Sequence, residues 1–410
     1  MALRPRARRI WATLRAERRT LLQGSVALVL STAASFVAGL TLGSITGTLD
    51  RLPGLLVLIP ASVGMRGTIF GAIGARLGTG IHAGLFEANL KRGGLLARNV
   101  EVGVVSTLLS SFYLAGVAKV VAAAFGERTI SFWDLLTISV VGGVIASAVI
   151  LLVTIRISVL SYRKGWDLDA VSTPMVTAIG DMVTLPALFA ASFIPSGDLA
   201  NAVVAGACTV LALAALVRGA TASPDTRRVL LEMVGVIALV PLLDIFAGAL
   251  LEARRPSLEA APAILIMIPP FVSQAGALGG ILSSRLSSKL QLGVITPRGR
   301  PEPPAVVDAG LVVLSGFAVF ALIGATALGL ANLTGLAHPG AQTMIGGTLF
   351  AGALVLPITL VAGYYVAVVT SRFGLDPDNH GVPIITSLLD LAGVGAVLFA
   401  MSVSGVTIHG

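Results

Sequence analysis

The 410-residue sequence is poor in charged residues and in cysteine. Asp, Glu, Lys and Arg make up 12% of the chain and hydrophobic residues 55%, whereas soluble domains carry about 25% charged residues. The single cysteine, Cys208, excludes an internal disulfide. The sequence contains no Walker-type glycine–lysine loop and no kinase signature, so we do not expect ATP-driven pumping by this chain alone.

Long apolar runs dominate what is present. The mean hydropathy is +0.94, and runs of about 20 apolar residues, long enough to cross a bilayer, recur along the chain. We therefore predict an all-α polytopic membrane protein with eleven transmembrane helices. Their expected ranges are 21–44, 53–78, 99–124, 133–158, 171–194, 199–217, 229–251, 260–288, 306–332, 342–370 and 380–404.

The basic residues predict the orientation. Seven arginines lie within the first nineteen residues, ahead of the first apolar run, which is typical of a cytoplasmic segment on anionic lipid. This distribution argues against nucleic acid as a partner, because no folded domain carries a basic face. Alternate loops from the N-terminus onward also hold most of the remaining Lys and Arg. We expect a multi-pass protein of the plasma (inner) membrane, with its N-terminus in the cytoplasm and its C-terminus outside.

An internal repeat becomes visible when the chain is shifted by 209 residues. The shift aligns IPASVGMRGTIFGAIGARLGTGIHAG (59–84) with IPPFVSQAGALGGILSSRLSSKLQLG (268–293). It also aligns RKGWDLDAVSTPMVTAIGD (163–181) with RFGLDPDNHGVPIITSLLD (372–390). Two blocks about a hundred residues apart keep one offset, which indicates a duplication.

The duplication predicts four segments. A basic cytoplasmic segment (1–20) precedes a first five-helix repeat (21–195), and a linking transmembrane helix with a cytoplasmic loop (196–228) leads to a second repeat (229–410). The linking helix restores the orientation of the second copy, so the repeats are parallel and related by a pseudo-two-fold axis along the membrane normal. Such a chain imitates a homodimer, and we expect it to function as a single chain.

The segment that enters the fifth span of each copy carries the motif P-x-x-T-x-x-x-D. Helical spacing places Thr177 and Asp181 on one stripe, and Thr386 and Asp390 on its twin. Asp390 is expected about 14 Å along the helix, near the middle of a hydrocarbon core about 30 Å thick. Ionisable residues at that depth usually serve function. The pseudo-two-fold would bring Asp181 and Asp390 face to face.

Two facing carboxylates repel each other, so a proton or a cation must lie between them. Mg²⁺ suits such a site because it keeps several waters and binds one or two carboxylates. The hydroxyls of Thr177, Thr386 and Ser387 would bind that hydration shell. The alternative is structural, with each aspartate capping a neighbouring helix or pairing with an arginine.

Other charged residues are candidates for the pathway. Four aspartates at the inner mouth could gather cations, or be solvated loop charges: Asp167, Asp169, Asp376 and Asp378. Asp244, in the seventh span, has Ser35 as its counterpart, and both function and structural pairing remain open for it. Arg66 has Ala275 as its counterpart and could shape the pore or form a structural salt bridge. The histidines lack the spacing of a zinc cluster.

Both repeated blocks, D-x-D…P-x-x-T-x-x-x-D and P-x-x-x-[GS]-x-x-G…R-L, resemble the membrane domain of MgtE-type magnesium transporters. The tandem-duplicated branch, which includes the animal solute-carrier magnesium transporters, is the more similar. The resemblance covers about residues 21–404. It implies a magnesium pathway along the pseudo-two-fold axis, with Asp181 and Asp390 as the central cation site. The chain departs from the family at Thr68 and Ala277, where members often carry Asn.

We therefore expect a magnesium transporter or channel, with Mg²⁺ as the transported ion and no organic cofactor. Another divalent ion such as Mn²⁺ or Co²⁺ is an alternative, although oxygen-only ligands favour Mg²⁺. An exporter coupled to Na⁺ or H⁺ is another. A hypothesis of a different class is an intramembrane enzyme that uses the aspartates as an acid–base pair.

Overall fold

The computed structural model describes residues 18–87, 89, 91, 93–164, 168–194, 198–374 and 381–404. Within these ranges, the side chains of residues 18–27, 50, 82, 164, 168–175, 177 and 198–201 are not described. Every regular element in this part of the chain is a helix. The helices are α2 (Arg18–Ser44), α3 (Thr46–Arg51), α4 (Leu55–His82), α5 (Leu95–Ala124), α6 (Phe132–Lys164), α7 (Leu168–Ala191), α8 (Asp198–Ala220), α9 (Pro224–Glu252), α10 (Arg255–Ala260), α11 (Pro262–Gln291), α12 (Pro303–Thr334), α13 (Ala341–Phe373) and α14 (Val382–Val403).

Most of these helices are suited to a bilayer. Within the described residues, nine are long and apolar enough to cross a membrane, and two shorter apolar stretches, Leu28–Ser44 and Ala178–Ala191, lie in α2 and α7. Each predicted span overlaps one of these helices. The prediction of an all-helical, multi-pass membrane protein is thereby confirmed, whereas eleven crossings remain a prediction.

The offset of 209 residues also relates the helix boundaries. Added to Thr46–Arg51 of α3, it gives residues 255–260, which are the bounds of α10. Added to α6, it gives residues 341–373, which are the bounds of α13. The sequence analysis did not predict α3 and α10, because a single turn or two of helix carries no apolar periodicity of its own.

Short local signals set several helix ends. Pro224 occupies the first turn of α9, where its missing N–H costs no hydrogen bond, and the Ser223 hydroxyl accepts from the Thr226 N–H. Gly335 and Gly374 end α12 and α13 in the left-handed conformation, at φ of 69° and 63°. These ends fix the lengths of the helices that surround the site.

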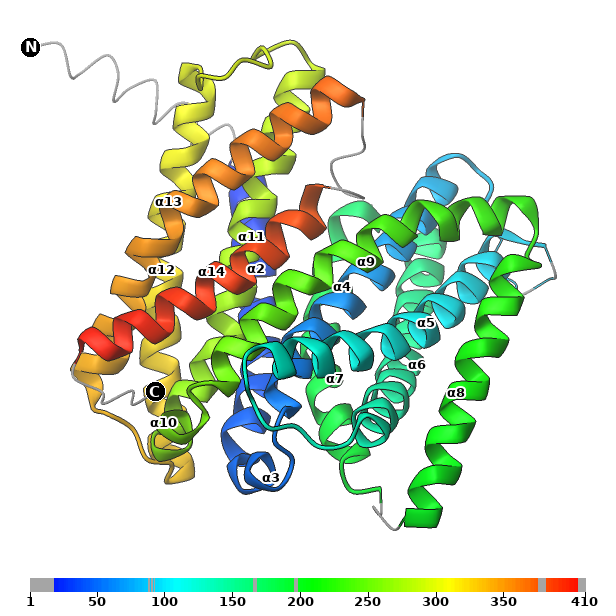
Figure 1. Cartoon of the computed structure of the whole chain (residues 1–410). Helices are drawn as coiled ribbons and strands as arrows, with labels where there is room; N and C mark the ends of the chain where they lie inside the picture. Colours follow the sequence, from blue (N-terminus) through cyan, green and yellow to red (C-terminus); the bar gives the residue numbers. More distant parts are fainter. Residues whose placement is uncertain are drawn as a thin grey trace, which may run out of the picture.

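The first helix of each half, α2 or α9, packs against the second helix of the other half, and we call this arrangement an exchange of first helices. α2 lies against α7 of its own half and against α11 of the other, while α9 lies against α14 and α4. These six helices meet in the middle of the bundle, and α12 and α13 flank one side of it while α5 and α6 flank the other (Figure 1). Residues from both halves therefore meet at the centre, which is where the acidic side chains lie.

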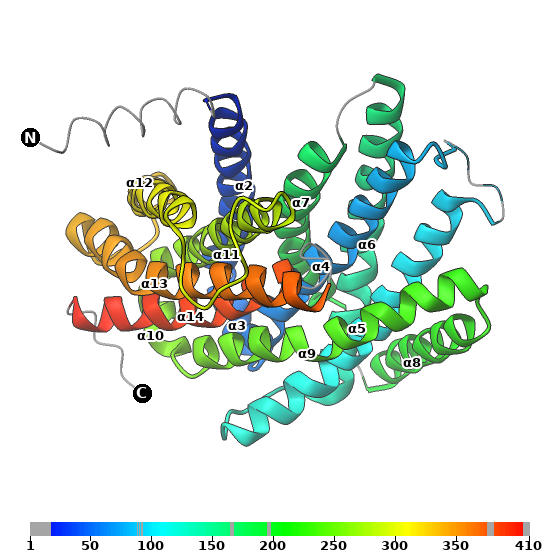
Figure 2. The ribbon, with the colours of Figure 1, turned by 90° about the horizontal axis from the view of Figure 1, so that it is seen from above.

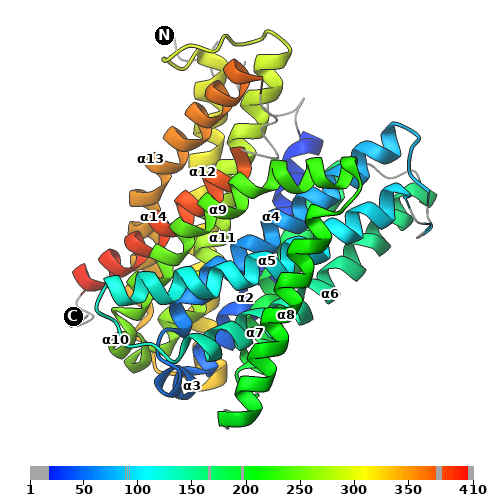
Figure 3. The same ribbon diagram turned by 45° about the vertical axis from the view of Figure 1, so that its right-hand side comes forward.

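The helix that joins the halves lies at the edge. α8 packs on α5 and α6; it lies at the edge of the molecule seen from above (Figure 2) and in front of the other helices in the turned view (Figure 3). Much of its surface is apolar and exposed, including Val203, Val210 and Leu213. Because a bilayer solvates such side chains, α8 is suited to face lipid rather than water.

Two glycines let the exchanged helices approach closely. A Cβ on Gly39 of α2 would collide with the backbone of Ile266 on α11. A Cβ on Gly248 of α9 would lie 2.5 Å from the carbonyl oxygen of Val57 on α4. Both pairs differ by 209 residues, Gly39 from Gly248 and Val57 from Ile266. The same close crossing therefore occurs once on each side of the bundle.

Candidate functional site

Asp181 lies on α7 and is held by hydroxyl groups of both halves. Its Oδ2 accepts a hydrogen bond of 2.7 Å from Ser35 Oγ on α2 and one of 2.9 Å from Ser273 Oγ on α11. The side chain is buried, with 8% of its surface exposed. Donors directed at a buried carboxylate stabilise its negative charge, so Asp181 has the partners that an ionised group needs.

Asp244, on α9, has a different environment. It is completely buried, and its carboxylate faces Ser387 and Asp390 of α14. Neither of its oxygens makes a hydrogen bond of regular geometry to a described residue. A buried carboxylate with so little hydrogen bonding is costly, and the Ser387 hydroxyl beside it is a weaker substitute for the two donors of Asp181.

Asp390 lies between the other two aspartates. It experiences electrostatic repulsion from Asp244 first and from Asp181 second. Unlike Asp244, it is partly exposed. Three carboxylates on three helices thus form one acidic centre, which concentrates negative charge inside an apolar bundle.

Gly64 on α4 gives the second-half carboxylates their space. A Cβ at this position would lie 2.5 Å from Oδ2 of Asp244 and 3.8 Å from Oδ2 of Asp390. Any side chain on residue 64 would therefore displace the Asp244 carboxylate. Gly64 thus makes room for the acidic centre on the side of the second half.

Residues of the site in one half have equivalent residues of the site in the other half. The offset of 209 residues relates Asp181 to Asp390, Ser35 to Asp244, and Gly64 to Ser273; it relates six residues in three pairs. Each fifth-span aspartate thus contacts the first helix of its own half and the second helix of the other. From the sequence alone, Ser35 was identified only as the counterpart of Asp244, and Ser273 and Gly64 were not predicted as parts of the site. The common offset was the signal that could have identified them.

The predicted pair is thus part of a larger group. Asp181 and Asp390 do belong to one centre, but the side chain that faces Asp390 most closely is Asp244. Among the described residues, no three His, Cys, Asp or Glu side chains converge tightly enough to coordinate one ion directly. Two carboxylates with retained water fit the chemistry of Mg²⁺ better than a complete protein cage does.

The remaining predicted residues differ in how they lie. Ser387 is buried beside Asp244, whereas the Thr386 hydroxyl donates to the Pro383 carbonyl oxygen of its own helix at 3.0 Å. Three inner-mouth aspartates, Asp167, Asp376 and Asp378, lie outside the described residues, and the side chains of Asp169 and Thr177 do as well.

Arg66 points away from the acidic centre into the first half. Its guanidinium is completely buried and donates to the Ser62 carbonyl oxygen at 3.1 Å and to Ser111 Oγ at 2.7 Å. None of the described carboxylates forms an ion pair with it. Neutral oxygen acceptors thus take the place of the salt bridge that was one of the two alternatives for Arg66, and a role for it in shaping the pore stays a prediction.

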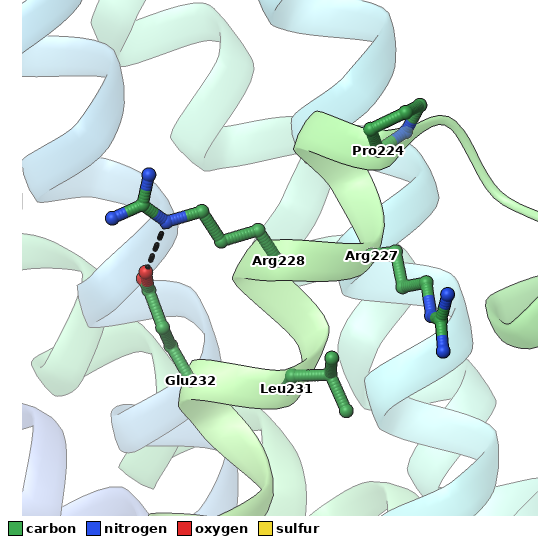
Figure 4. A pocket seen from close by; sticks show the side chains of 5 residues that line it. All are labelled: Pro224, Arg227, Arg228, Leu231 and Glu232. Atoms are coloured by element: carbon green, nitrogen blue, oxygen red, sulfur yellow. Dashed lines mark hydrogen bonds and ion pairs between the residues drawn. The ribbon is translucent and has the colours of Figure 1, made fainter.

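A surface hollow at the start of α9 is separate from this centre. It is lined by Pro224, Arg227, Arg228, Leu231 and Glu232 (Figure 4). Arg228 and Glu232 form an exposed ion pair of 3.0 Å. Glu232 is about 18 Å along the helix from Asp244, at 1.5 Å per residue. The hollow therefore plays no part in the acidic centre.

Comparison with known proteins agrees with the duplicated architecture. Residues 59–191 and 268–400 each match MgtE, described as a divalent cation transporter. The two matched regions begin and end at positions that differ by 209 residues. The resemblance inferred from the sequence motifs is therefore confirmed, and so is the duplication.

Curated relatives match most of the chain. Solute carrier family 41 member 3 of Rattus norvegicus is 24% identical over 401 residues, covering 91% of this chain and 85% of the rat protein. Solute carrier family 41 member 2 of Homo sapiens is 24% identical over 380 residues, covering 85% of this chain and 63% of the human protein. The member 2 protein of Gallus gallus is 25% identical over 372 residues, covering 83% and 62%.

No solved structure matches the chain significantly. The family match covers well over half of the chain, and both the family and these relatives are named as transporters rather than enzymes. This excludes the hypothesis of an intramembrane enzyme. The chain belongs to the MgtE family of divalent cation transporters.

Proposed function

We propose that this protein carries Mg²⁺ across the plasma membrane through its acidic centre. The observation that supports this most strongly is the meeting of Asp181 and Asp390, one from each half, inside an apolar bundle of a divalent cation transporter family. Buried carboxylates of this kind need a cation to offset their repulsion. A partly hydrated Mg²⁺ held by aspartate oxygens meets that need.

The oxygen chemistry of the centre favours Mg²⁺ over softer ions. Its polar groups are the carboxylates of Asp181, Asp244 and Asp390 and the hydroxyls around them, with no imidazole or thiol among the described side chains close by. Mn²⁺ and Co²⁺ bind more tightly where nitrogen or sulfur ligands contribute. The transported ion we propose is therefore Mg²⁺, in its hydrated form.

The architecture we propose has eleven crossings and a pseudo-two-fold axis along the membrane normal. Matched helix boundaries, the paired crossings at Gly39 and Gly248, and the exchanged first helices support it. One chain would then provide a complete pathway without a second subunit. The excess of Lys and Arg in alternate loops supports a cytoplasmic N-terminus and an extracytoplasmic C-terminus.

Membrane potential can drive uptake without ATP. A divalent ion gains about 4.6 kcal/mol for each 100 mV of inside-negative potential, twice the value for a single charge. That free energy supports accumulation by about three orders of magnitude. We accordingly propose that the inward direction is driven by voltage.

The test is magnesium flux in proteoliposomes. We expect the wild-type chain to carry Mg²⁺ and the Asp181→Asn, Asp390→Asn double variant to carry at least tenfold less, because the amides retain shape but lose charge. Glu232→Gln, a surface change of the same kind, should leave flux unchanged. Wild-type flux in the double variant would refute the assignment of the site, and no wild-type Mg²⁺ flux would refute the function.

A further inference from the structure

The duplication would give Asp181 and Asp390 equivalent surroundings, but the groups around the two aspartates differ. On the first-half side, Asp181 receives two hydroxyl donors, from Ser35 and Ser273. On the second-half side, Asp390 faces a second carboxylate, Asp244, where the first half has Ser35. A hydroxyl donor on one side is thus replaced by a negative group on the other.

The presence of Asp244 at the position equivalent to Ser35 determines which carboxylates need a cation. One carboxylate oxygen of Asp181, Oδ2, accepts from two protein hydroxyls. Asp244 has two completely buried oxygens with no regular hydrogen bond to the described residues. The strongest repulsion on Asp390 comes from Asp244, and the Ser387 hydroxyl beside Asp244 offsets it only in part, so the demand for a cation is greatest between Asp244 and Asp390.

Space and access favour the same side. Gly64 presents no side chain to the two carboxylates, and its hypothetical Cβ position is 2.5 Å from Asp244 Oδ2 and 3.8 Å from Asp390 Oδ2. In the first half the equivalent position is Ser273, whose hydroxyl contacts Asp181. Asp390 is partly exposed whereas Asp244 is completely buried, so an ion would approach the pair from the side of Asp390.

We propose that the divalent cation binds off the pseudo-two-fold axis, between Asp244 and Asp390, with the Ser387 hydroxyl beside it. This inference rests on the proposed function and specifies where in the acidic centre the ion lies. Asp181 is then no direct ligand but a neighbouring negative charge held by serines. Two carboxylates and retained water complete the coordination that Mg²⁺ accepts.

Binding separates this arrangement from a symmetric one. Mg²⁺ binding to the purified full-length chain in nanodiscs would be measured by titration calorimetry, together with monodispersity on gel filtration. We expect Asp244→Asn and Asp390→Asn each to weaken binding at least tenfold, and Asp181→Asn to weaken it less than threefold. If Asp181→Asn weakens binding as much as Asp390→Asn, or if Asp244→Asn leaves it unchanged, the off-axis site is wrong.

A steric pair of variants provides a test without a change of charge. Gly64→Ala places a methyl group against Asp244 and should weaken Mg²⁺ binding at least tenfold. Gly71→Ala, on the same helix two turns away, has nothing within 4 Å of its new methyl group and should bind as the wild type does. Equal binding by the two variants would overturn the proposal.

The third test moves the site. In a Ser35→Asp, Ser273→Gly, Asp244→Ser triple variant, which also gives the new pair the space that Gly64 leaves in the native site, the carboxylate pair would form with Asp181 instead of Asp390. In that background, Asp181→Asn should weaken binding at least tenfold and Asp390→Asn less than threefold, the reverse of the native order. Retention of the native order would reject the inference. An absence of any Mg²⁺ binding by the wild type would instead reject the proposed function, which keeps the two failures distinct.

Discussion

Ser273 on α11 donates a hydrogen bond of 2.9 Å to Asp181 on α7, and so links the second half of the chain to the acidic residue of the first. Together with Ser35, which donates at 2.7 Å, it holds one carboxylate oxygen of Asp181 from two sides. The centre is therefore a joint between the halves as well as a cluster of charge.

Loss of the Ser273 hydroxyl should weaken this joint. Ser273→Ala removes a hydrogen bond to a charged group, which contributes about 1.5–3 kcal/mol. We expect a lower Tm for the purified protein. Ser288→Ala is the matched control, because that exposed hydroxyl on the same helix bonds only to the Ser284 carbonyl oxygen of its own helix. A fall in Tm of equal size in both variants would contradict the link.

A methyl group added at either of the two close helix crossings should destabilise the protein to a similar extent. Gly39→Ala and Gly248→Ala each push α2 or α9 away from the backbone that it crosses, and overpacking of this kind costs about 1–3 kcal/mol. We expect both to lower Tm. Gly235→Ala, on α9 with nothing within 4 Å of the new methyl group, should not.

The contrast between the two crossings also tests the symmetry. If only one of Gly39→Ala and Gly248→Ala lowers Tm, the halves are not packed in the equivalent way that the repeat predicts. A Tm drop in Gly235→Ala would show instead that the cost comes from the added methyl group anywhere on the helix.

The buried residue Arg66 and the two serines beside it in the first half should be replaceable, as a set, by the residues at the equivalent positions of the second half. Around Arg66, the first half has Ser62 and Ser111, and at the equivalent positions the second half has Phe271 and Phe320, stacked at 4.4 Å between ring centroids. A Ser62→Phe, Arg66→Ala, Ser111→Phe triple variant replaces a buried charge with packed rings. Because replacement of buried charged groups by well-packed apolar side chains is often neutral or stabilising, we expect its Tm to equal or exceed that of the wild type.

Single changes in that set should behave differently. Ser111→Phe alone inserts a ring against the Arg66 guanidinium and removes its acceptor, so we expect a loss of Tm that the triple variant recovers. Additive effects of the three single substitutions would contradict this coupling.

The sequence predicts the positions of the long helices well because long apolar runs mark them, although local signals such as Ser223 and Gly335 set their ends. The offset of 209 residues also identified the two aspartates of the fifth spans and the pairing of Asp244 with Ser35. It could not show that α9 turns Asp244 toward Asp390, since that contact depends on how separate helices pack. The role of Gly64 could not be predicted for the same reason, because the carboxylates nearest to it belong to residues distant in the chain.

Arg66 illustrates a different limit. A lone arginine in an apolar run suggested an ion pair, but the partners in the structure are a backbone carbonyl and a serine hydroxyl, neither of which carries a charge. Serine and backbone oxygens are too common in the sequence to be recognised as acceptors before the helices are placed.

The exchange of first helices has a consequence for how the chain can be divided. α2 completes its packing on α11 and α9 completes its packing on α4, so neither half contains all the surfaces that its own helices require. If the loop after α8 were cut, each fragment would expose its first helix and the surface that the first helix of the other half covers. The fragments would reassemble only when made together in the same cell.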